Sequence, residues 1–182
     1  MAYINANDLM RFQNKIIDET EENIEQLNSY CKSSEQMIEK YLHYCPEIKE
    51  YTKRIKSDGG NLLELGTMPI SEVTSVFIDD VESDVSLYSF ETEKPYLQKS
   101  DFSNFQKGSI YTITFTAGYT TEDFPEIIKT TALQIASLFW ESSGGNLAVS
   151  STTYADTGSR VFNNFTADRF LKQLDMYKIE LV

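Results

Sequence analysis

The sequence predicts an α+β fold, in which a helical bundle carries a small antiparallel β-hairpin or sheet inserted in its middle third. Apolar residues recur at helical spacing in residues 1–45 and again in residues 123–182. Between them, residues 50–116 alternate with a period of two and are rich in β-branched side chains. We therefore expect residues 1–182 to form a single domain with helical ends and a β-rich centre.

Two helices are predicted in the N-terminal part. The first is short and begins after Asn5 or Asn7, either of which could cap it. The second runs from about Thr20 to Tyr44, and Pro46 ends it. Steps of three, four and seven place its apolar residues on one stripe: Ile24, Leu27, Cys31, Ile38 and Leu42.

Turn residues divide the β-rich centre into strands. Asp58-Gly59 lies between two extended runs, residues 51–56 and 62–65, and this arrangement predicts a hairpin. Residues 73–78 are rich in β-branched side chains and form the next predicted strand.

The rest of the centre is less regular. Residues 79–84 are acidic and are predicted to form a turn, residues 87–90 a further strand, and residues 91–107 an irregular excursion. Residues 110–116 form the clearest strand, with threonines on one face. The opposite face carries Tyr111, Ile113 and Phe115.

A central helix is predicted near residues 125–142. Asp123 and Glu126 have the spacing of a capping box, with Pro125 in the first turn. One apolar stripe carries Ile128, Ala132, Ile135, Ala136 and Phe139. Leu133, Leu138 and Trp140 lie off that stripe, so this helix is predicted to be nearly surrounded by protein.

The C-terminal part is predicted to contain a long mobile arm and a short helix. Residues 142–164 are small, polar and interrupted by glycines, which indicates an arm without structure of its own. The apolar residues of this arm are Leu147, Val149, Tyr154, Val161 and Phe162. The final helix begins near Thr166 and buries one side, and the apolar tail 179–182 is expected to pack into its own core or into a partner.

Composition excludes several classes of protein. The net charge of −12 disfavours binding to nucleic acid or to acidic membranes. No apolar run is long enough to span a bilayer, and the N-terminus does not have the features of a signal peptide, so we expect a soluble protein made in a cytoplasm. Cys31, Cys45 and the lone His43 do not form a metal-binding pattern, and no cofactor is predicted.

The sequence contains no constellation of catalytic groups that points to an enzyme. His43 lies at a predicted helix end, where a structural role is favoured. The cluster Asp79, Asp80, Glu82 and Asp84 offers oxygen ligands for calcium, but its spacing does not match a helix-loop-helix calcium site, and a solvated acidic turn is the better interpretation. Ser159 does not have the flanking glycines of a nucleophile elbow. We therefore expect a protein that is not an enzyme.

Four motifs follow one another along most of the chain. An acidic amphipathic helix, T-E-E-N-I-E-Q-L-N-S-Y-C through M-I-E-K-Y-L, comes first. A proline before a Val-rich strand follows in L-E-L-G-T-M-P-I-S-E-V-T-S-V-F-I-D. A strand then ends in T-F-T-A-G-Y, and F-P-E-I-I-K-T-T-A-L-Q-I-A-S-L-F-W-E opens a helix that closes with an aromatic residue and a glutamate.

In this order the four motifs resemble the head–tail connector (adaptor, or head completion) proteins of bacteriophages. The resemblance implies a structural protein of the virion neck. Such proteins form a homo-oligomeric ring, commonly twelve-fold in the virion, beneath the portal protein. The ring extends the DNA channel, through which packaged DNA passes without specific binding, and docks the stopper or tail-completion protein. The resemblance implies no catalysis, no cofactor and no membrane, and assembly in the host cytoplasm. For docking on the portal or on a neighbour we expect the terminal residues Phe170, Leu174, Tyr177, Ile179, Leu181 and Val182, together with the arm.

Two other functions stay open at this point. The net charge also fits an acidic DNA mimic that inhibits a nucleic-acid-binding protein. An α+β fold with a cleft also fits a small hydrolase. The connector reading is favoured because it accounts for the order of the motifs along most of the chain.

Overall fold

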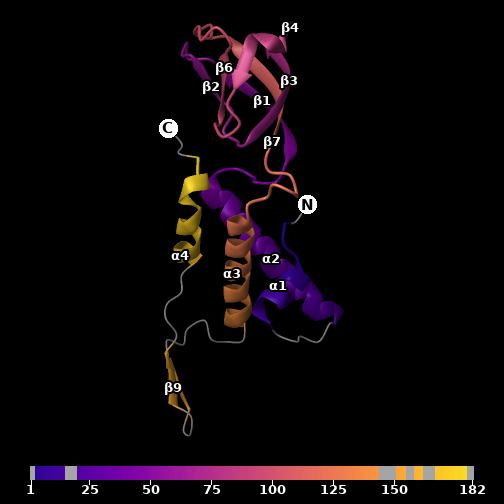
Figure 1. Ribbon diagram of the computed structural model, residues 1–182, viewed down its shortest axis with the longest axis vertical. Helices are drawn as coiled ribbons and strands as arrows, with labels where there is room; N and C mark the ends of the chain where they lie inside the picture. The colour runs from indigo at the N-terminus through magenta and orange to yellow at the C-terminus, as the bar shows by residue number, and fades with distance from the viewer. Residues whose placement is uncertain (1–2, 15–19, 144–150, 155–157, 162–166, 180–182) are drawn as a thin grey trace. The chain divides into compact units, whose positions relative to one another are not determined.

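The structure is a computed structural model, and it describes residues 3–14, 20–143, 151–154, 158–161 and 167–179. The chain divides into two compact units, each assembled from separate stretches. The helical unit comprises Met1–Tyr41 and Pro125–Lys178, and the β unit comprises Leu42–Phe124 and Ile179–Val182. Figure 1, coloured by residue number, shows that helices precede and follow the strand-rich segment in the sequence. The predicted α+β class, with sheet structure in the middle of a helical chain, is confirmed.

The helical unit opens with α1 (Ala6–Gln13) and α2 (Glu21–Leu42), so both predicted N-terminal helices are confirmed. Of the two candidate caps, Asn5 is the one used. Its side chain accepts hydrogen bonds from the N–H groups of Asn7 and Asp8, and the Asp8 carboxylate accepts one from the Asn5 N–H. The Thr20 hydroxyl accepts from the Asn23 N–H at the start of α2.

Side chains of α2 accept hydrogen bonds from the backbone of the segment that leads into α1, and these bonds fix its position. The Ala6 N–H donates to the Asn28 side-chain oxygen (3.0 Å), and the Ile4 N–H donates to the Glu35 carboxylate (3.0 Å). Glu35 is only 8% exposed, so this bond satisfies a carboxylate that has largely lost its contact with water. The first helix is therefore positioned by polar contacts as well as by the burial of Leu9 and Leu27.

α3 (Glu126–Ser143) is the central helix of this unit, and its predicted enclosure is confirmed. It contacts α1 and the C-terminal helices. Residues 127–140 include no exposed side chain, and five of them are fully buried, namely Ile128, Thr131, Ala132, Ile135 and Ala136. The ring of Tyr30 in α2 lies 6.4 Å from the rings of both Phe139 and Trp140.

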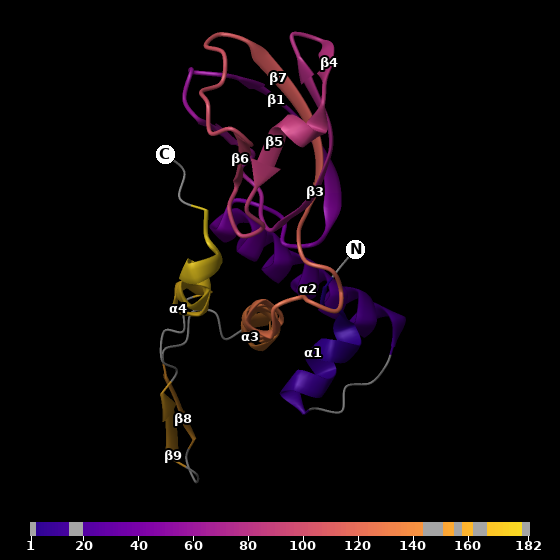
Figure 2. The ribbon, with the colours of Figure 1, turned by 45° about the horizontal axis from the view of Figure 1, so that its top comes forward.

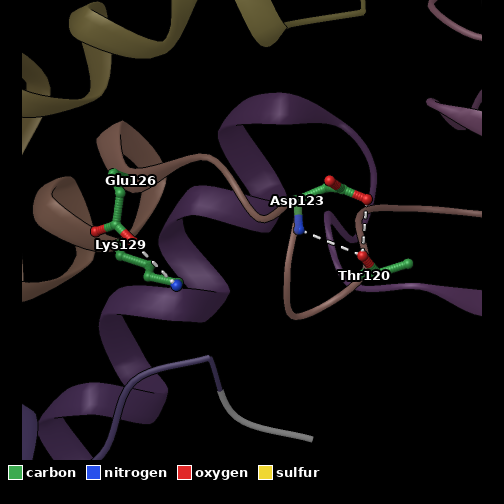
Figure 3. Close-up of polar contacts among 4 residues, drawn as sticks. All are labelled: Thr120, Asp123, Glu126 and Lys129. Atoms are coloured by element: carbon green, nitrogen blue, oxygen red, sulfur yellow. Dashed lines mark hydrogen bonds and ion pairs between the residues drawn. The ribbon is translucent and has the colours of Figure 1, made fainter.

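The start of α3 uses its capping residues differently from the prediction. The Asp123 carboxylate accepts from the Thr120 hydroxyl (3.0 Å), and that hydroxyl accepts from the Asp123 N–H (3.3 Å). Glu126 instead pairs with Lys129 at 3.2 Å, and Figure 3 shows these two separate contacts. The Pro125 carbonyl accepts from the Ile128 N–H, so the helix begins one residue after the proline.

The C-terminal part of the helical unit contains α4 (Ala167–Leu171), which runs directly into the 3-10 helix η2 (Lys172–Tyr177). The predicted final helix is therefore confirmed, although Thr166 lies outside the described residues. The arm differs from its prediction as a loop without structure. Its described parts, β8 (Ser151–Tyr154) and β9 (Gly158–Val161), form a two-stranded antiparallel sheet, in keeping with the preference of Thr152, Thr153 and Tyr154 for extended structure.

The β unit contains two antiparallel sheets. The larger has the order β1-β7-β3-β4, and the smaller has the order β2-β6-β5. Their bounds are β1 Lys49–Lys56, β2 Leu62–Glu64, β3 Ile70–Ile78, β4 Val81–Ser83, β5 Tyr88–Phe90, β6 Tyr96–Lys99 and β7 Ile110–Ala117. A 3-10 turn, η1 (Val85–Leu87), joins β4 to β5.

One hydrophobic core fills the β unit. It combines residues of the larger sheet with residues of the smaller one, among them Phe115 and Leu97. The predicted inward face of β7 is confirmed, since Tyr111, Ile113 and Phe115 are at most 1% exposed. β7 pairs with β1 on one side and with β3 on the other, so it is an interior strand of the larger sheet.

The predicted hairpin at Asp58-Gly59 is wrong. β1 pairs with β7 and β2 pairs with β6, so the turn passes the chain from one sheet to the other. The tight hairpin instead connects β3 and β4 through Asp79 and Asp80, whose φ angles are 48° and 67°. Aspartate is one of the few non-glycine residues that adopt a positive φ readily. Two consecutive residues with positive φ are typical of a two-residue type I′ turn.

Two further details of the centre also differ from the prediction. The segment 79–84 is a turn only at its start, because Val81–Ser83 form β4. The stretch 91–107, predicted to be irregular, contains β6, which is the middle strand of the smaller sheet. The predicted strand 87–90 is confirmed as β5 with a start one residue later.

We predict that Gly118→Ala lowers the free energy of unfolding by about 3 kcal/mol. Gly118 has φ +110°, and an added Cβ would meet the Glu47 carbonyl well inside contact distance. Gly108→Ala is the matched control, since Gly108 has φ +88° but nothing lies within 4 Å of an added Cβ. The Gly108→Ala control should lower the free energy of unfolding by only about 1 kcal/mol. Denaturant unfolding of both variants tests this, and equal losses would contradict it.

We also predict that Thr131→Val raises the free energy of unfolding by about 1 kcal/mol. The Thr131 hydroxyl is fully buried in α3 and has no hydrogen-bond partner among the described residues. Ser34→Ala provides the contrast, because the buried Ser34 hydroxyl donates to the Cys31 carbonyl at 2.7 Å. The Ser34→Ala protein should have a free energy of unfolding lower by about 1 kcal/mol. A destabilised Thr131→Val protein in the same denaturation assay would refute the explanation.

Candidate partner-binding surfaces

The predicted terminal docking residues fall into three groups. Leu174 is fully buried and Ile179 is 4% exposed, so both belong to the chain's own packing. Phe170 and Tyr177 are half-buried. Leu181 and Val182 lie outside the described residues. The structure therefore brings only part of the predicted set to a surface.

Polar contacts hold η2 against the end of α2. The Tyr41 hydroxyl donates to the Asp175 carboxylate, and this bond raises the pKa of Tyr41. The Lys178 ammonium lies 4.9 Å from the centre of the Tyr41 ring, a cation–π contact. The Ile179 N–H, which belongs to the β unit, donates to the Leu42 carbonyl at 3.2 Å.

Met176 was not among the predicted docking residues, although it is 80% exposed and is the exposed large apolar side chain among the described residues of this segment. A helical period of 3.6 does not single it out. η2 has the tighter 3-10 period of three, which aligns Leu171, Leu174 and Tyr177 on one side. Met176 lies off that side and offers a polarizable, adaptable contact for a partner.

The predicted arm residues give less information about a site. Tyr154 and Val161 lie at opposite ends of the β8–β9 register, in strands β8 and β9. Leu147, Val149 and Phe162 lie outside the described residues. The contribution of the arm to partner binding stays a prediction.

The helical unit has a groove of about 440 Å³ between α1 and α3. Its apolar lining includes Ile4, Phe12 and Leu133. Its lining also carries charges of both signs, namely Asp8, Arg11, Glu126 and Lys129. Phe12 is 44% exposed, so this groove presents an apolar side chain beside charged ones, of which Glu126 and Lys129 pair with each other.

The β unit has a second groove, of about 520 Å³, which we call the β1–β2 groove. It is lined from β1 by Ile55 and Lys56, from β2 by Leu62, Leu63 and Glu64, and otherwise by Asp58, Pro95 and Tyr96. The two strands are edge strands of different sheets, so the groove lies between two sheet edges. Burial lowers the pKa of the nearby Lys53, although the charge of Glu64 works against that shift.

The titratable groups do not form a reaction centre in the described part of the chain. Burial raises the pKa of the Cys31 thiol to about 12, which makes it inert as a nucleophile. Hydrogen bonds from backbone N–H groups lower the pKa of Asp79, Asp84 and Asp101, which is ordinary turn chemistry. No cluster of three His, Cys, Asp or Glu side chains among the described residues could hold a metal ion. None of the described helices is long and apolar enough to cross a membrane.

No protein family model matches the chain, and no curated protein matches its sequence. Solved structures do match it. A chain from a structure described as the neck of an empty GTA particle computed with C6 symmetry has a TM-score of 0.66 and 14% identity, covering 99% of this chain and 91% of the other.

Two further structures agree with the first. A chain from the virion of a native gene transfer agent (GTA) particle has a TM-score of 0.67 at 12% identity, with the same coverage of 99% and 91%. A chain from the neck of a native GTA particle computed with C12 symmetry has a TM-score of 0.58 at 14% identity, covering 86% and 83%. The chain thus has the fold of chains found in these particles, and the resemblance to head–tail connector proteins is confirmed at the level of the fold.

Proposed function

We propose that this chain is a structural protein of a virion neck, and specifically a head–tail adaptor. In this proposal, copies form a ring beneath the portal protein, extend the DNA channel and dock a stopper or tail-completion protein. The observation that carries the proposal is the likeness of nearly the whole chain to chains of GTA neck and virion structures. Two of those structures have C6 or C12 symmetry, which supports a ring and favours twelve copies in the particle.

The physical features of the chain are consistent with this role. A closed ring needs two different patches on each copy that fit each other head to tail. The chain offers two grooves and several exposed apolar side chains, among them Phe12, Val81 and Met176. The function needs no catalytic group or cofactor, and packaged DNA would pass an acidic wall without binding to it.

The test is electron microscopy of the chain mixed with the portal ring of the same particle. We expect ring-shaped classes of the adaptor stacked on the portal, with twelve copies. A chain that stays monomeric beside an excess of portal would contradict the proposal. If that monomer instead bound a nucleic-acid-binding enzyme, the acidic DNA mimic would be the correct function. A ring with a basic lumen would refute the acidic channel wall.

We further propose that the segment 170–182 docks on the portal, and we predict that Met176→Lys weakens portal binding about tenfold. The exposed thioether would lose its apolar contact and gain a charge, while the monomer keeps its stability because the side chain is 80% exposed. Gln36→Lys, at an exposed position of α2, is the matched control. Portal pull-down titrations and thermal unfolding measure the two effects. Equal binding by both variants would remove this segment from the interface.

A further inference from the structure

The two edges of the larger β-sheet carry opposite charge. β1 forms one edge and β4 the other, with β7 and β3 between them (Figure 2). The basic edge, which we define as Lys49–Lys56, contains four basic residues and one acidic residue. The acidic edge, which we define as residues 79–84, contains four acidic residues and no basic residue. The basic edge therefore stands out in a chain whose net charge is −12.

The backbone of the basic edge is available for pairing. The Ser57 N–H donates to the Ser109 carbonyl, just beyond the end of the β1–β7 pairing. The Asp79 N–H donates to the Ile110 carbonyl, so the backbone of Ile110 is directed toward β3 and not toward β1. Because bonded pairs alternate along an antiparallel ladder, the odd-numbered residues of β1 bond to β7. The N–H and C=O groups of the even-numbered residues point away from β7. These residues are Glu50, Thr52, Arg54 and Lys56.

The side chains of the basic edge are available as well. Arg54 and Lys56 are exposed, and neither stands in a salt bridge among the described residues. The pKa of Asp79 in the same copy, lowered chiefly by the hydrogen bond from the Ile110 N–H, is lowered further by the charge of Arg54. The β1–β2 groove lies directly beside them, with apolar lining from Ile55, Leu62 and Tyr96. The two acidic residues of the groove already have interactions, since Asp58 accepts from the Gly60 N–H at 2.8 Å and Glu64 lies near Lys53.

The acidic edge has the complementary features. Asp79 and Asp80 form the narrow turn between β3 and β4, and the next residue, Val81, is 69% exposed. The pair Ile78–Val81 closes this turn, so the backbone groups of Glu82 point outward. The side chains of Asp80 and Glu82 are exposed and form no hydrogen bond or ion pair within the described residues. A projecting apolar residue is thus flanked by unpaired carboxylates.

We propose that the acidic edge of one copy docks on the basic edge of a second copy, with Val81 entering the β1–β2 groove and Asp80 and Glu82 facing Arg54 and Lys56. Backbone bonds of Glu82 to β1 add a strand to the sheet of the second copy, a recurring mode of recognition. The interface is heterologous, so each copy uses both edges and the assembly can close into a ring.

Charge selects this pairing over the alternatives. Contact between two basic edges or two acidic edges would place like charges opposite each other, which is destabilising. Basic side chains on an edge strand also serve in many proteins to prevent aggregation. That role alone predicts no association between copies, whereas the proposed docking predicts association that weakens as salt screens the charges.

This inference rests on the proposed ring for its biological meaning, but its test measures contact between two copies directly. The experiment is sedimentation velocity of the full chain over a range of concentrations at low and high salt. The variants are Lys56→Glu, Glu82→Lys and the double variant, with Glu93→Lys as the matched control. Glu93 is an exposed acidic residue between β5 and β6, and the control changes the charge as Glu82→Lys does.

We expect the original chain to associate, and each single reversal to weaken association by at least about tenfold. The double variant should recover most of that loss, and the control should behave as the original chain. An original chain that stays monomeric at every concentration would overturn the proposal. The proposal would also fail if Glu82→Lys associated as strongly as the original chain, or if the double variant associated as weakly as the single variants. Portal-bound rings seen by microscopy together with any of those results would retain the neck function and remove this interface.

Discussion

The β unit depends on a close approach of the backbone where the chain enters and leaves it. The Tyr119 N–H donates to Pro46 at 2.8 Å, the Ile48 N–H donates to Tyr119 at 3.1 Å, and the Gly118 N–H donates to Pro69 at 2.8 Å. These bonds require the backbone of Gly118 to lie against Glu47, where a side chain could not fit. Because its two ends meet, a segment of some 80 residues folds as a unit between α2 and α3.

The helical unit depends on a different constraint, the enclosure of α3. A helix with apolar residues on several sides must be covered on several sides, and α1, α4 and η2 contact it within this unit. The cover comes from both ends of the chain, so a local stretch of sequence cannot complete this unit. The polar bonds from α2 to the α1 segment, through Asn28 and Glu35, matter for the same reason, since they hold one of the covering elements in place.

Local patterns predicted the helices well and the strand pairing poorly, and the reason is physical. Helix caps and apolar spacing are local, so the cap of α1 could be narrowed to Asn5 or Asn7, and the stripe from Ile128 to Ala136 could be predicted directly. Strand partners are chosen by contacts distant in sequence. Asp58-Gly59 has good turn chemistry, yet β1 pairs with β7, some 60 residues further on, because β7 buries one face and bonds on both sides. The candidate surfaces were harder still, since Met176 is exposed by the 3-10 period of η2 and Val81 by a turn that looked merely acidic.

Net charge gives an incomplete picture of how copies of this chain would meet. A uniformly acidic surface would keep copies apart, because like charges repel over about one Debye length, roughly 8 Å at physiological salt. A ring therefore requires local departures from the average, and β1 is such a departure. Composition cannot reveal it, because the basic residues of β1 stand among strand residues of ordinary type. The basic edge becomes apparent once the strand order places β1 at one edge of the larger sheet and β4, with the acidic turn before it, at the other. A chain that binds its own copies head to tail needs two different surfaces, and these two edges provide them.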